Sequence, residues 1–434
     1  MQLGNTRLIN TCRVVAGVAA LSLTIYWAGV TVPALASPKP ASDSKAMAAH
    51  PFVNDIGLVE TALGCARSLS SSDLHMFFGE RRGSLIGWDN PHVIQLGPER
   101  WLWLNHDTYI DLSGDARTLH DGGEQNQNVA FEQTGNCFAM LHRGTPTERL
   151  NFEIGDGHVD RNRFLWPLGG EVDGDVVRVF WAETIPSVPR PGPGDGIIRH
   201  PTKTWLAEYD VTTLERLSFA PAPNSGVDPI YGFAVASDDH HSYLFGNTNM
   251  LNLAREGGFF NGPHSATKMY LARVPRGQLD QAPEYWNGTG WADDASSSVP
   301  ISNRFFAENT MQPRYLDGRW VSVVQQDGFY SREVLLDVAE HPWGPWTTVD
   351  QRTYTGRLAA VEKNSYQPII LPWSSPEAGI TIAISENATD WMNAVADPPL
   401  YRPGVFAFPW PVDLGEITTH AAASVPARRV GGSR

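Results

Sequence analysis

Cysteine is scarce in this sequence, which contains Cys12, Cys65 and Cys137 among its 434 residues. No cysteine or histidine spacing resembles a zinc site, because the adjacent His240 and His241 would point to opposite faces of a strand. The Gly-x-Ser-x-Gly elbow of serine hydrolases and the phosphate-binding P-loop are both missing. The sequence therefore predicts no metal ion and no cofactor.

Positive charge is also in short supply, since 33 lysines and arginines stand against 47 acidic residues and give a formal net charge of -14. The basic residues are scattered along the chain. Nucleic acids and anionic membrane surfaces both require a basic face on their protein partner. We therefore expect a monomer that binds neither nucleic acid nor, in its mature form, a membrane, and whose partner is neutral.

Long apolar runs are limited to one, from Val14 to Val32, which follows a start that carries Arg7 and Arg13. The run leads to Ala34-Leu35-Ala36, and this order of basic, apolar and small residues is typical of a secretory signal peptide. We predict a signal peptide over residues 1–36. The alternative is a retained membrane anchor, because the run approaches the roughly 20 residues that span a bilayer.

Whether the apolar run is a cleaved signal peptide or a retained anchor, we expect the rest of the chain outside the cytoplasm, secreted or held in the cell envelope. Cys12 falls within the signal segment, and outside the cell the remaining pair, Cys65 and Cys137, favours a disulfide. Two unrelated buried thiols are the alternative. Residues 37–55 are predicted to be a polar linker, 56–415 a single domain, and 416–434 a small, polar, disordered tail.

Within residues 56–415 one pattern recurs five times: an apolar strand, a polar turn and a second apolar strand. Aspartate or asparagine with glycine between apolar runs is the strongest short-range signal for a hairpin. The copies recur at intervals of roughly 60 to 80 residues, which fits a four-stranded propeller blade with large loops. The turns are expected at 97–100, 173–175, 238–239, 317–318 and between 371 and 380.

The strands of these hairpins are apolar on both faces, so each hairpin is expected to be buried on both sides. A β-sandwich would instead show shorter alternating strands with turns about every 8–12 residues. No stretch has the helical period of a βαβ unit. The sequence therefore predicts an all-β fold, a five-bladed β-propeller in a single domain, with the hairpins as the inner halves of the blades.

Two aspartates flank the first hairpin at similar distances from its turn. Asp89 precedes the first strand and Asp107 ends the second, and residues equally far from the turn lie side by side in an antiparallel hairpin. We expect both carboxyls on one rim of the propeller, about 5 to 10 Å apart, the range that glycoside hydrolysis needs. The alternative is structural, since aspartates at strand ends commonly cap turns.

The same construction places further side chains on that rim, where carboxylates, amides and aromatic rings combine with few positive charges. Aromatic faces and amide hydrogen bonds suit sugar rings, which present C–H patches and hydroxyls together. Most tryptophans alternate within strands and are expected in the core, whereas Trp88 and Trp166 stand at strand entrances as candidate platforms. The predicted substrate-binding residues are Trp88, His106, Trp166, Glu183, Tyr231, Asn247, Gln312 and Tyr366.

Several short motifs span most of the chain from about Leu74 to Pro411. They are Trp88-Asp89-Asn90, Leu104-Asn105-His106-Asp107-Thr108, Trp166-Pro167, Tyr270-Leu271-Ala272-Arg273-Val274-Pro275, Tyr285-Trp286-Asn287-Gly288, Gly344-Pro345-Trp346 and Tyr401-Arg402-Pro403. In this order they resemble a secreted actinobacterial family of five-bladed β-propellers. That family was long catalogued as a domain of unknown function and is associated with endo-D-arabinanases acting on mycobacterial arabinogalactan and lipoarabinomannan.

The resemblance implies a glycoside hydrolase that cuts internal bonds of an arabinan-like cell-wall polysaccharide. In that family the two aspartates of the first blade are the catalytic pair, and they match Asp89 and Asp107. This sequence differs from the family at His106, where glycine is usual, and at Asn90-Pro91, where small residues are usual. The resemblance leaves open which aspartate is the acid and whether hydrolysis retains or inverts. The rival interpretation is a non-catalytic propeller that binds a glycan or a cell surface.

Overall fold

The computed structural model describes residues 57–89, 91–121, 125–143, 150–155, 164–189, 197–227, 229–247, 268–301, 312–326, 332–356 and 363–410. The predicted signal peptide, linker and tail lie outside these residues. No helix in the described ranges has the length and apolar character needed to cross a membrane.

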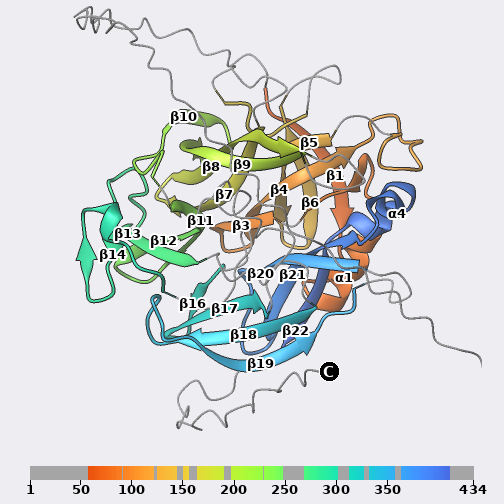
Figure 1. Cartoon of the computed structure of the whole chain (residues 1–434). Coiled ribbons are helices and arrows are strands. Elements are labelled where there is room, and N and C mark those ends of the chain that lie inside the picture. Colours follow the sequence, from red (N-terminus) through yellow and green to blue (C-terminus); the bar gives the residue numbers. More distant parts are fainter. Residues whose placement is uncertain are drawn as a thin grey trace, which may run out of the picture. The chain divides into compact units, whose positions relative to one another are not determined.

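Five antiparallel sheets follow one another in chain order around a common centre, and they form the predicted five-bladed β-propeller (Figure 1). The last sheet lies beside the first, which closes the ring. The innermost strands of the five blades are β3 (Pro91–Gly97), β7 (Phe164–Asp173), β11 (Ile230–Ser237), β16 (Arg314–Leu316) and β20 (Lys363–Ile370).

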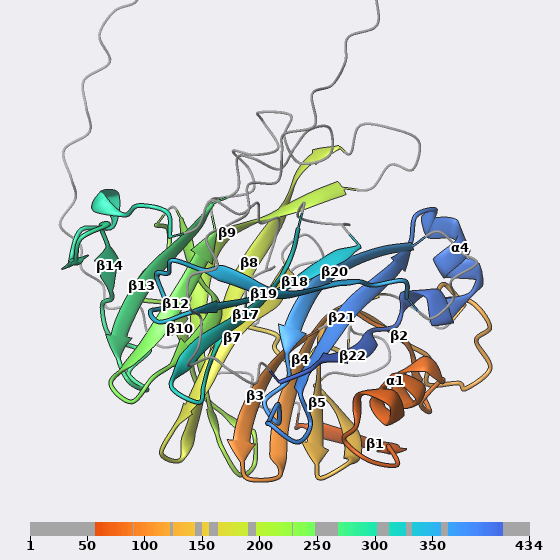
Figure 2. The ribbon, with the colours of Figure 1, turned by 90° about the horizontal axis from the view of Figure 1, so that it is seen from below.

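The blades continue outward from these strands, and the long pair β8 and β9 projects beyond the others on one side of the ring (Figure 2). The first blade adds β4 (Arg100–Ile110), β5 (Gln125–Thr134), β6 (Cys137–His142) and β1 (Val59–Cys65), and the second adds β8 (Val176–Pro189), β9 (Ile197–Asp210) and β10 (Arg216–Pro221). The third adds β12 (His241–Asn247), β13 (Met269–Pro275), β14 (Glu284–Trp286) and β15 (Trp291–Ala292). The fourth adds β17 (Arg319–Gln325), β18 (Glu333–Ala339) and β19 (Thr347–Thr353), and the fifth adds β21 (Ile380–Ala388) and β22 (Gly404–Phe408). The remaining elements are β2 (Leu85–Gly87), which pairs with β4, the helices α1 (Ser71–Gly79) and α4 (Trp391–Ala396), and the 3-10 helices η1 (Ala295–Ser297) and η2 (Pro398–Tyr401).

Each of the five predicted hairpins forms the inner two strands of one blade. In the fourth blade, Asp317 and Gly318 both have positive φ, 49° and 76°. A two-residue turn with positive φ at both positions matches the right-handed twist of the strands that it joins.

Side chains of the inner hairpins point alternately toward the two neighbouring blades. In β4, Trp103 packs in a cluster with Ala383 of the fifth blade, while Leu102 packs in a cluster with Val179 of the second blade. Five apolar clusters fill the five gaps between blades in this way. Each fully buried side chain of this kind stabilises the fold by about 1.5–3 kcal/mol.

Helix α1 completes the ring next to the three-stranded fifth blade (Figures 1 and 2). The Ser70 hydroxyl caps the helix by accepting the Asp73 N–H at 3.2 Å. The buried face of α1, with Phe77 and Phe78, joins the cluster between the fifth and first blades. The Nδ1 atom of His75 accepts the Val405 N–H at 3.1 Å, so the helix covers the outer edge of β22.

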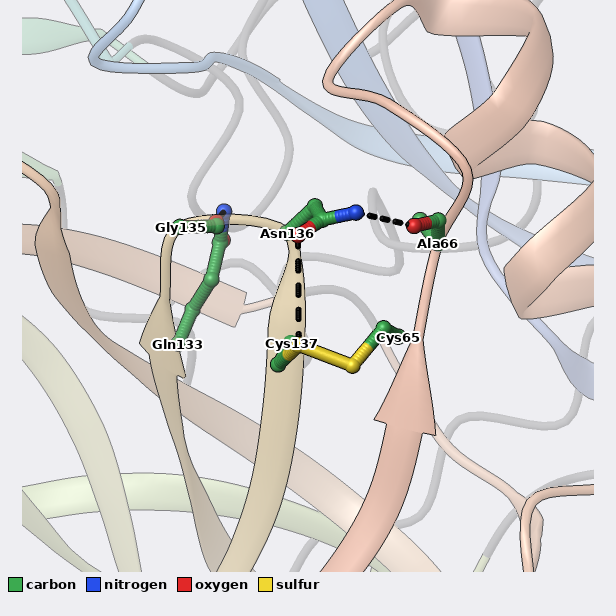
Figure 3. Close-up of a disulfide and its surroundings, with 6 residues drawn as sticks. All are labelled: Cys65, Ala66, Gln133, Gly135, Asn136 and Cys137. Carbon is green, nitrogen blue, oxygen red and sulfur yellow. Dashed lines mark hydrogen bonds between the residues drawn. A yellow bond between two sulfur atoms is a disulfide. The ribbon is translucent and has the colours of Figure 1, made fainter.

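A disulfide joins Cys65 to Cys137 (Figure 3). The two cysteines are register partners on β1 and β6, and the Ala66 N–H donates to the Asn136 carbonyl at 2.8 Å beside them. The bond ties the outermost strand of the first blade to the blade itself. A cross-link of this kind stabilises mainly by restricting the unfolded chain, typically by about 2–4 kcal/mol.

Candidate active site

Asp89 and Asp107 occupy facing positions on neighbouring strands of the first blade. On one side of Asp89, Gly87 pairs with Tyr109, and on the other side Pro91 pairs with Asn105. The two pairs share one register. Asp89, between Gly87 and Pro91, therefore faces Asp107, between Asn105 and Tyr109. The hairpin therefore brings the two predicted catalytic residues together.

The backbone at Asp107 interrupts the regular ladder of β4. Its φ of 30° lies in a region that residues other than glycine seldom adopt, and such conformations cluster at functional sites. The pairing with β5 includes His106 and Thr108 but omits Asp107. The Asp107 carbonyl instead accepts the Tyr401 hydroxyl at 3.0 Å. The distortion leaves the Asp107 side chain half-buried at the end of the hairpin.

Asp89 is held in a much drier environment and is only 8% exposed. Burial and the charge of Asp107 together raise the pKa of Asp89 to about 8, although hydrogen bonds from Tyr366 and Tyr401 oppose the rise. The Tyr366 hydroxyl donates to Oδ1 of Asp89. Asp89 is therefore mainly protonated at neutral pH and can give a proton to a bound molecule.

Three tyrosines surround the two aspartates. Tyr109 packs edge-on against Tyr401, with ring centroids 5.8 Å apart, and Tyr366 comes from the inner strand of the fifth blade. Burial, reinforced by the charges of Asp89 and Asp107, holds the pKa of Tyr109 and of Tyr401 above the usual range. These hydroxyls remain protonated and act as hydrogen-bond donors.

His106 stacks on Trp166 at the boundary between the first and second blades. The rings are nearly parallel, at 7°, with centroids 5.6 Å apart, and Nε2 of His106 lies 2.8 Å from the Pro167 carbonyl. Burial lowers the pKa of His106 to about 4, so the ring is neutral at pH 7 and Nε2–H donates to that carbonyl. The imidazole therefore supports the half-buried Trp166 indole from behind.

Glu183 and Asn247 lie on the second strands of the next two inner hairpins, Glu183 within β8 and Asn247 at the end of β12. Glu183 is nearly buried, pairs with Leu165, and accepts the Trp205 indole N–H at 3.0 Å. Asn247 is almost fully buried, and neither its amide nitrogen nor its amide oxygen has a hydrogen-bond partner among the described residues. Both lie about as far from their hairpin turns as Asp107 does in β4.

Three predicted substrate-binding residues lie elsewhere. Trp88 is 1% exposed and packs edge-on against Phe78 and Phe131, because a residue next to the site-facing Asp89 points to the opposite face of its strand. Tyr231 is fully buried against Tyr285. Neither ring has an exposed face, which the predictions of Trp88 as a platform and of Tyr231 as a substrate-binding residue both require. Gln312 lines a cavity between the inner strands.

The sequence reasoning missed the roles of Tyr401 and Tyr109. Tyr401 opens the Tyr401-Arg402-Pro403 motif, to which no role was assigned. Arg402 fixes this segment, because its guanidinium donates to the carbonyls of Ile86 and Gly79 at 2.6 and 2.7 Å. Tyr109 follows Asp107 by two residues on β4, and strand alternation alone could have placed it beside the site. The described residues contain no group of three or more histidine, cysteine or acidic side chains that could hold a metal ion.

The fold and this site define the protein as a five-bladed β-propeller with a carboxylate pair at one end of its first inner hairpin. The family described as a domain of unknown function (DUF5005) matches residues 73–408, and the chain belongs to this family. No curated protein matches the sequence.

Solved structures resemble this chain at low sequence identity. The crystal structure of a "putative hydrolase" from Bacteroides ovatus has a TM-score of 0.54 and 18% identity, and the match covers 77% of this chain and 88% of that chain. A GH43_1 enzyme from Xanthomonas citri matches at a TM-score of 0.40 and 11% identity, over 74% of this chain and 88% of that chain. An exo-β-1,3-galactanase from Phanerochaete chrysosporium matches at a TM-score of 0.38 and 9% identity, over 80% of this chain and 64% of that chain.

Proposed function

We propose that this protein is a secreted glycoside hydrolase that cuts internal bonds of an arabinan-like cell-wall polysaccharide. The observation that carries the proposal is the facing pair Asp89 and Asp107, one buried with a raised pKa and the other half-buried. Two carboxyl groups in different environments are the arrangement by which glycosidases separate an acid from a second carboxylate.

Asp89 is the general acid of the proposed reaction. Its proton passes to the glycosidic oxygen as the bond to the anomeric carbon breaks, and the leaving sugar departs as an alcohol. Tyr366 and Tyr401 keep the Asp89 carboxyl oriented and stabilise the carboxylate that results.

Asp107 is the nucleophile of the proposed reaction. Facing positions in an antiparallel pair bring the Asp89 and Asp107 side chains close together, and direct attack by the second carboxylate is the route of retaining enzymes. Asp107 bonds to the anomeric carbon, and water activated by the Asp89 carboxylate then releases the sugar with its configuration retained.

The choice of substrate rests on the motifs shared with the endo-D-arabinanase family and on the chemistry beside the aspartates. The half-buried Trp166 indole stacks on His106, the residue before Asp107, and is the aromatic candidate for sugar contact in the proposed site. The likeness in fold to a Bacteroides ovatus protein described as a hydrolase agrees with an enzyme.

Reducing-end release from arabinogalactan, measured beside retention of the protein on the same polysaccharide, tests the proposal. We expect the full chain to release new reducing ends, and we expect Asp89→Asn to bind the polymer without releasing them. Retention without release by the unaltered protein would contradict the proposal and favour a glycan-binding propeller.

A further inference from the structure

The propeller axis contains a small space to which all five inner strands contribute. The space has a volume of about 20 Å³, and its lining includes His92, Gly169, Val235, Arg314 and Ile370, one from each blade. Each inner strand is the last strand of its sheet on the axial side. Backbone groups of the strand edges therefore face this space.

Two adjacent glycines make the space narrow. A Cβ on Gly169 would lie 2.4 Å from the Val235 backbone nitrogen, and one on Gly170 would lie 2.3 Å from the Arg178 carbonyl oxygen. Only glycine allows β7 to approach its neighbours this closely. The space that remains can hold a water molecule or a monatomic ion but not a sugar.

Arg314 contributes a positive charge to this space. Its Nε donates to the Ile370 carbonyl at 2.6 Å and its Nη2 to the Val93 carbonyl at 3.0 Å, which links the fourth blade to the fifth and the first. No carboxylate among the described residues pairs with Arg314, whereas Arg100 and Arg216 both have such partners, Glu132 and Glu153, at 2.5 Å. Burial lowers the pKa of Arg314 to about 10, so the guanidinium remains charged at neutral pH.

A guanidinium that is partly shielded from water and has no carboxylate partner among the described residues favours a negative charge beside it. The other side chains that line the cavity include the imidazole of His92 and the amide of Gln312, and each carries N–H groups that can donate. A guanidinium with spare N–H donors, an imidazole and an amide match a small anion.

We propose that the axial cavity binds a monatomic anion of the size of chloride or bromide, with Arg314 as its charged ligand and His92 and Gln312 as neutral donors. The anion neutralises Arg314 and ties the first, fourth and fifth blades together at the axis. This site is separate from the proposed carboxylate chemistry and does not depend on it.

Thermal unfolding of the full chain in sodium chloride or bromide, compared with sodium gluconate at equal ionic strength, tests the binding. A ligand that binds only the folded state raises the unfolding temperature with its concentration until the site is saturated. We expect such a rise with both halides and none with gluconate, and we expect Arg314→Gln to abolish it. The control Arg319→Gln, at an arginine of the same blade that lies 3.8 Å from Glu340, should keep the full response.

Equal unfolding temperatures in halide and gluconate would overturn the proposal, and so would an unchanged halide response in Arg314→Gln. Anomalous diffraction from crystals of the unaltered protein soaked in bromide gives an answer that does not depend on any variant. We expect a bromide peak in contact with the Arg314 guanidinium. A water molecule in the cavity with no bromide signal would contradict the anion site.

Discussion

Tyr401 contacts both strands that carry the aspartate pair. Its hydroxyl donates to the Asp107 carbonyl at 3.0 Å, and its own carbonyl accepts the N–H of Trp88, the residue before Asp89, also at 3.0 Å. The C-terminal end of the propeller thus fixes the spacing of two residues that lie about 300 positions earlier in the chain. Tyr401 is accordingly a positioning residue for the proposed reaction.

Tyr401→Phe should lower kcat by about tenfold and leave KM nearly unchanged, because the ring still packs while the bond to Asp107 is lost. The same change removes a hydrogen bond that lowers the pKa of Asp89. The alkaline limb of the pH profile should therefore move to higher pH, a shift that a merely structural role would not produce. Tyr243→Phe, which removes a similar hydroxyl bonded to Asp238 at 3.0 Å, serves as the control and should leave activity and profile unchanged.

The pH profile of kcat/KM for the unaltered enzyme should fall on the alkaline side near pH 8. Asp89 must be protonated to act as the acid, and its pKa in the free protein is raised to about 8. Initial rates from pH 4 to 10 measure this limb. A profile that already falls between pH 5 and 6 would show that Asp89 does not act as the acid.

Asp89→Asn should be more stable than the unaltered protein at pH 8. This gain in stability should be small or absent at pH 4. The pKa of Asp89 is raised by folding, so below the unfolded value of 3.8 both states are protonated and the group costs nothing. As the pH rises from 3.8 to about 8, the unfolded chain ionises while the folded protein does not, and stability falls by up to a few kcal/mol. Asparagine at position 89 does not ionise, so the variant does not lose this stability as the pH rises.

Unfolding temperatures of both proteins across this range measure the effect. Asp210→Asn is the matched control, because hydrogen bonds from the Thr213 backbone and side chain lower the pKa of Asp210, so that replacement should not stabilise. A constant difference between Asp89→Asn and the unaltered protein at every pH would contradict the raised pKa.

Gly170→Ala should destabilise the propeller, because the added methyl would meet the Arg178 carbonyl at 2.3 Å and Cδ1 of Ile94 at 2.9 Å. Overpacking of this kind costs about 1–3 kcal/mol. Gly290→Ala provides the control, since a methyl there meets nothing within 4 Å. Chemical unfolding of the two variants should separate them clearly, and equal stability would mean that β7 can move away from the axis at little cost.

The hairpins and the facing aspartates could be predicted from the sequence because both depend on local rules. A turn such as Asp317-Gly318 selects its own conformation, and the register of a hairpin follows from its turn. The burial of Trp88 and Tyr231 depends instead on how blades pack against one another, which no local pattern specifies. Tyr401 and Arg314 act through contacts 294 and 221 residues away in the sequence, to Asp107 and Val93.

Helix α1 was not among the predicted elements, although the sequence carries a signal for a helix start. Ser70 with Asp73 three residues later marks a helix start, and Leu74, Phe77 and Phe78 follow at helical spacing. The helix matters because His75 covers the edge of β22, a strand that would otherwise be open to pairing.

The turnover of Asp89→Asn, Asp107→Asn and Glu183→Gln on one arabinan, measured beside polysaccharide binding, tests the central claim most directly. Loss of acid catalysis or of the nucleophile at almost constant volume should lower turnover at least about a hundredfold in each aspartate variant while binding persists. The double variant should be scarcely worse than the poorer single one, because residues that act as a unit are strongly non-additive. Glu183→Gln, which retains a group able to accept the Trp205 indole N–H, should cost far less. If Glu183→Gln abolishes turnover while Asp107→Asn leaves it near normal, the facing pair of the first blade is not the catalytic pair.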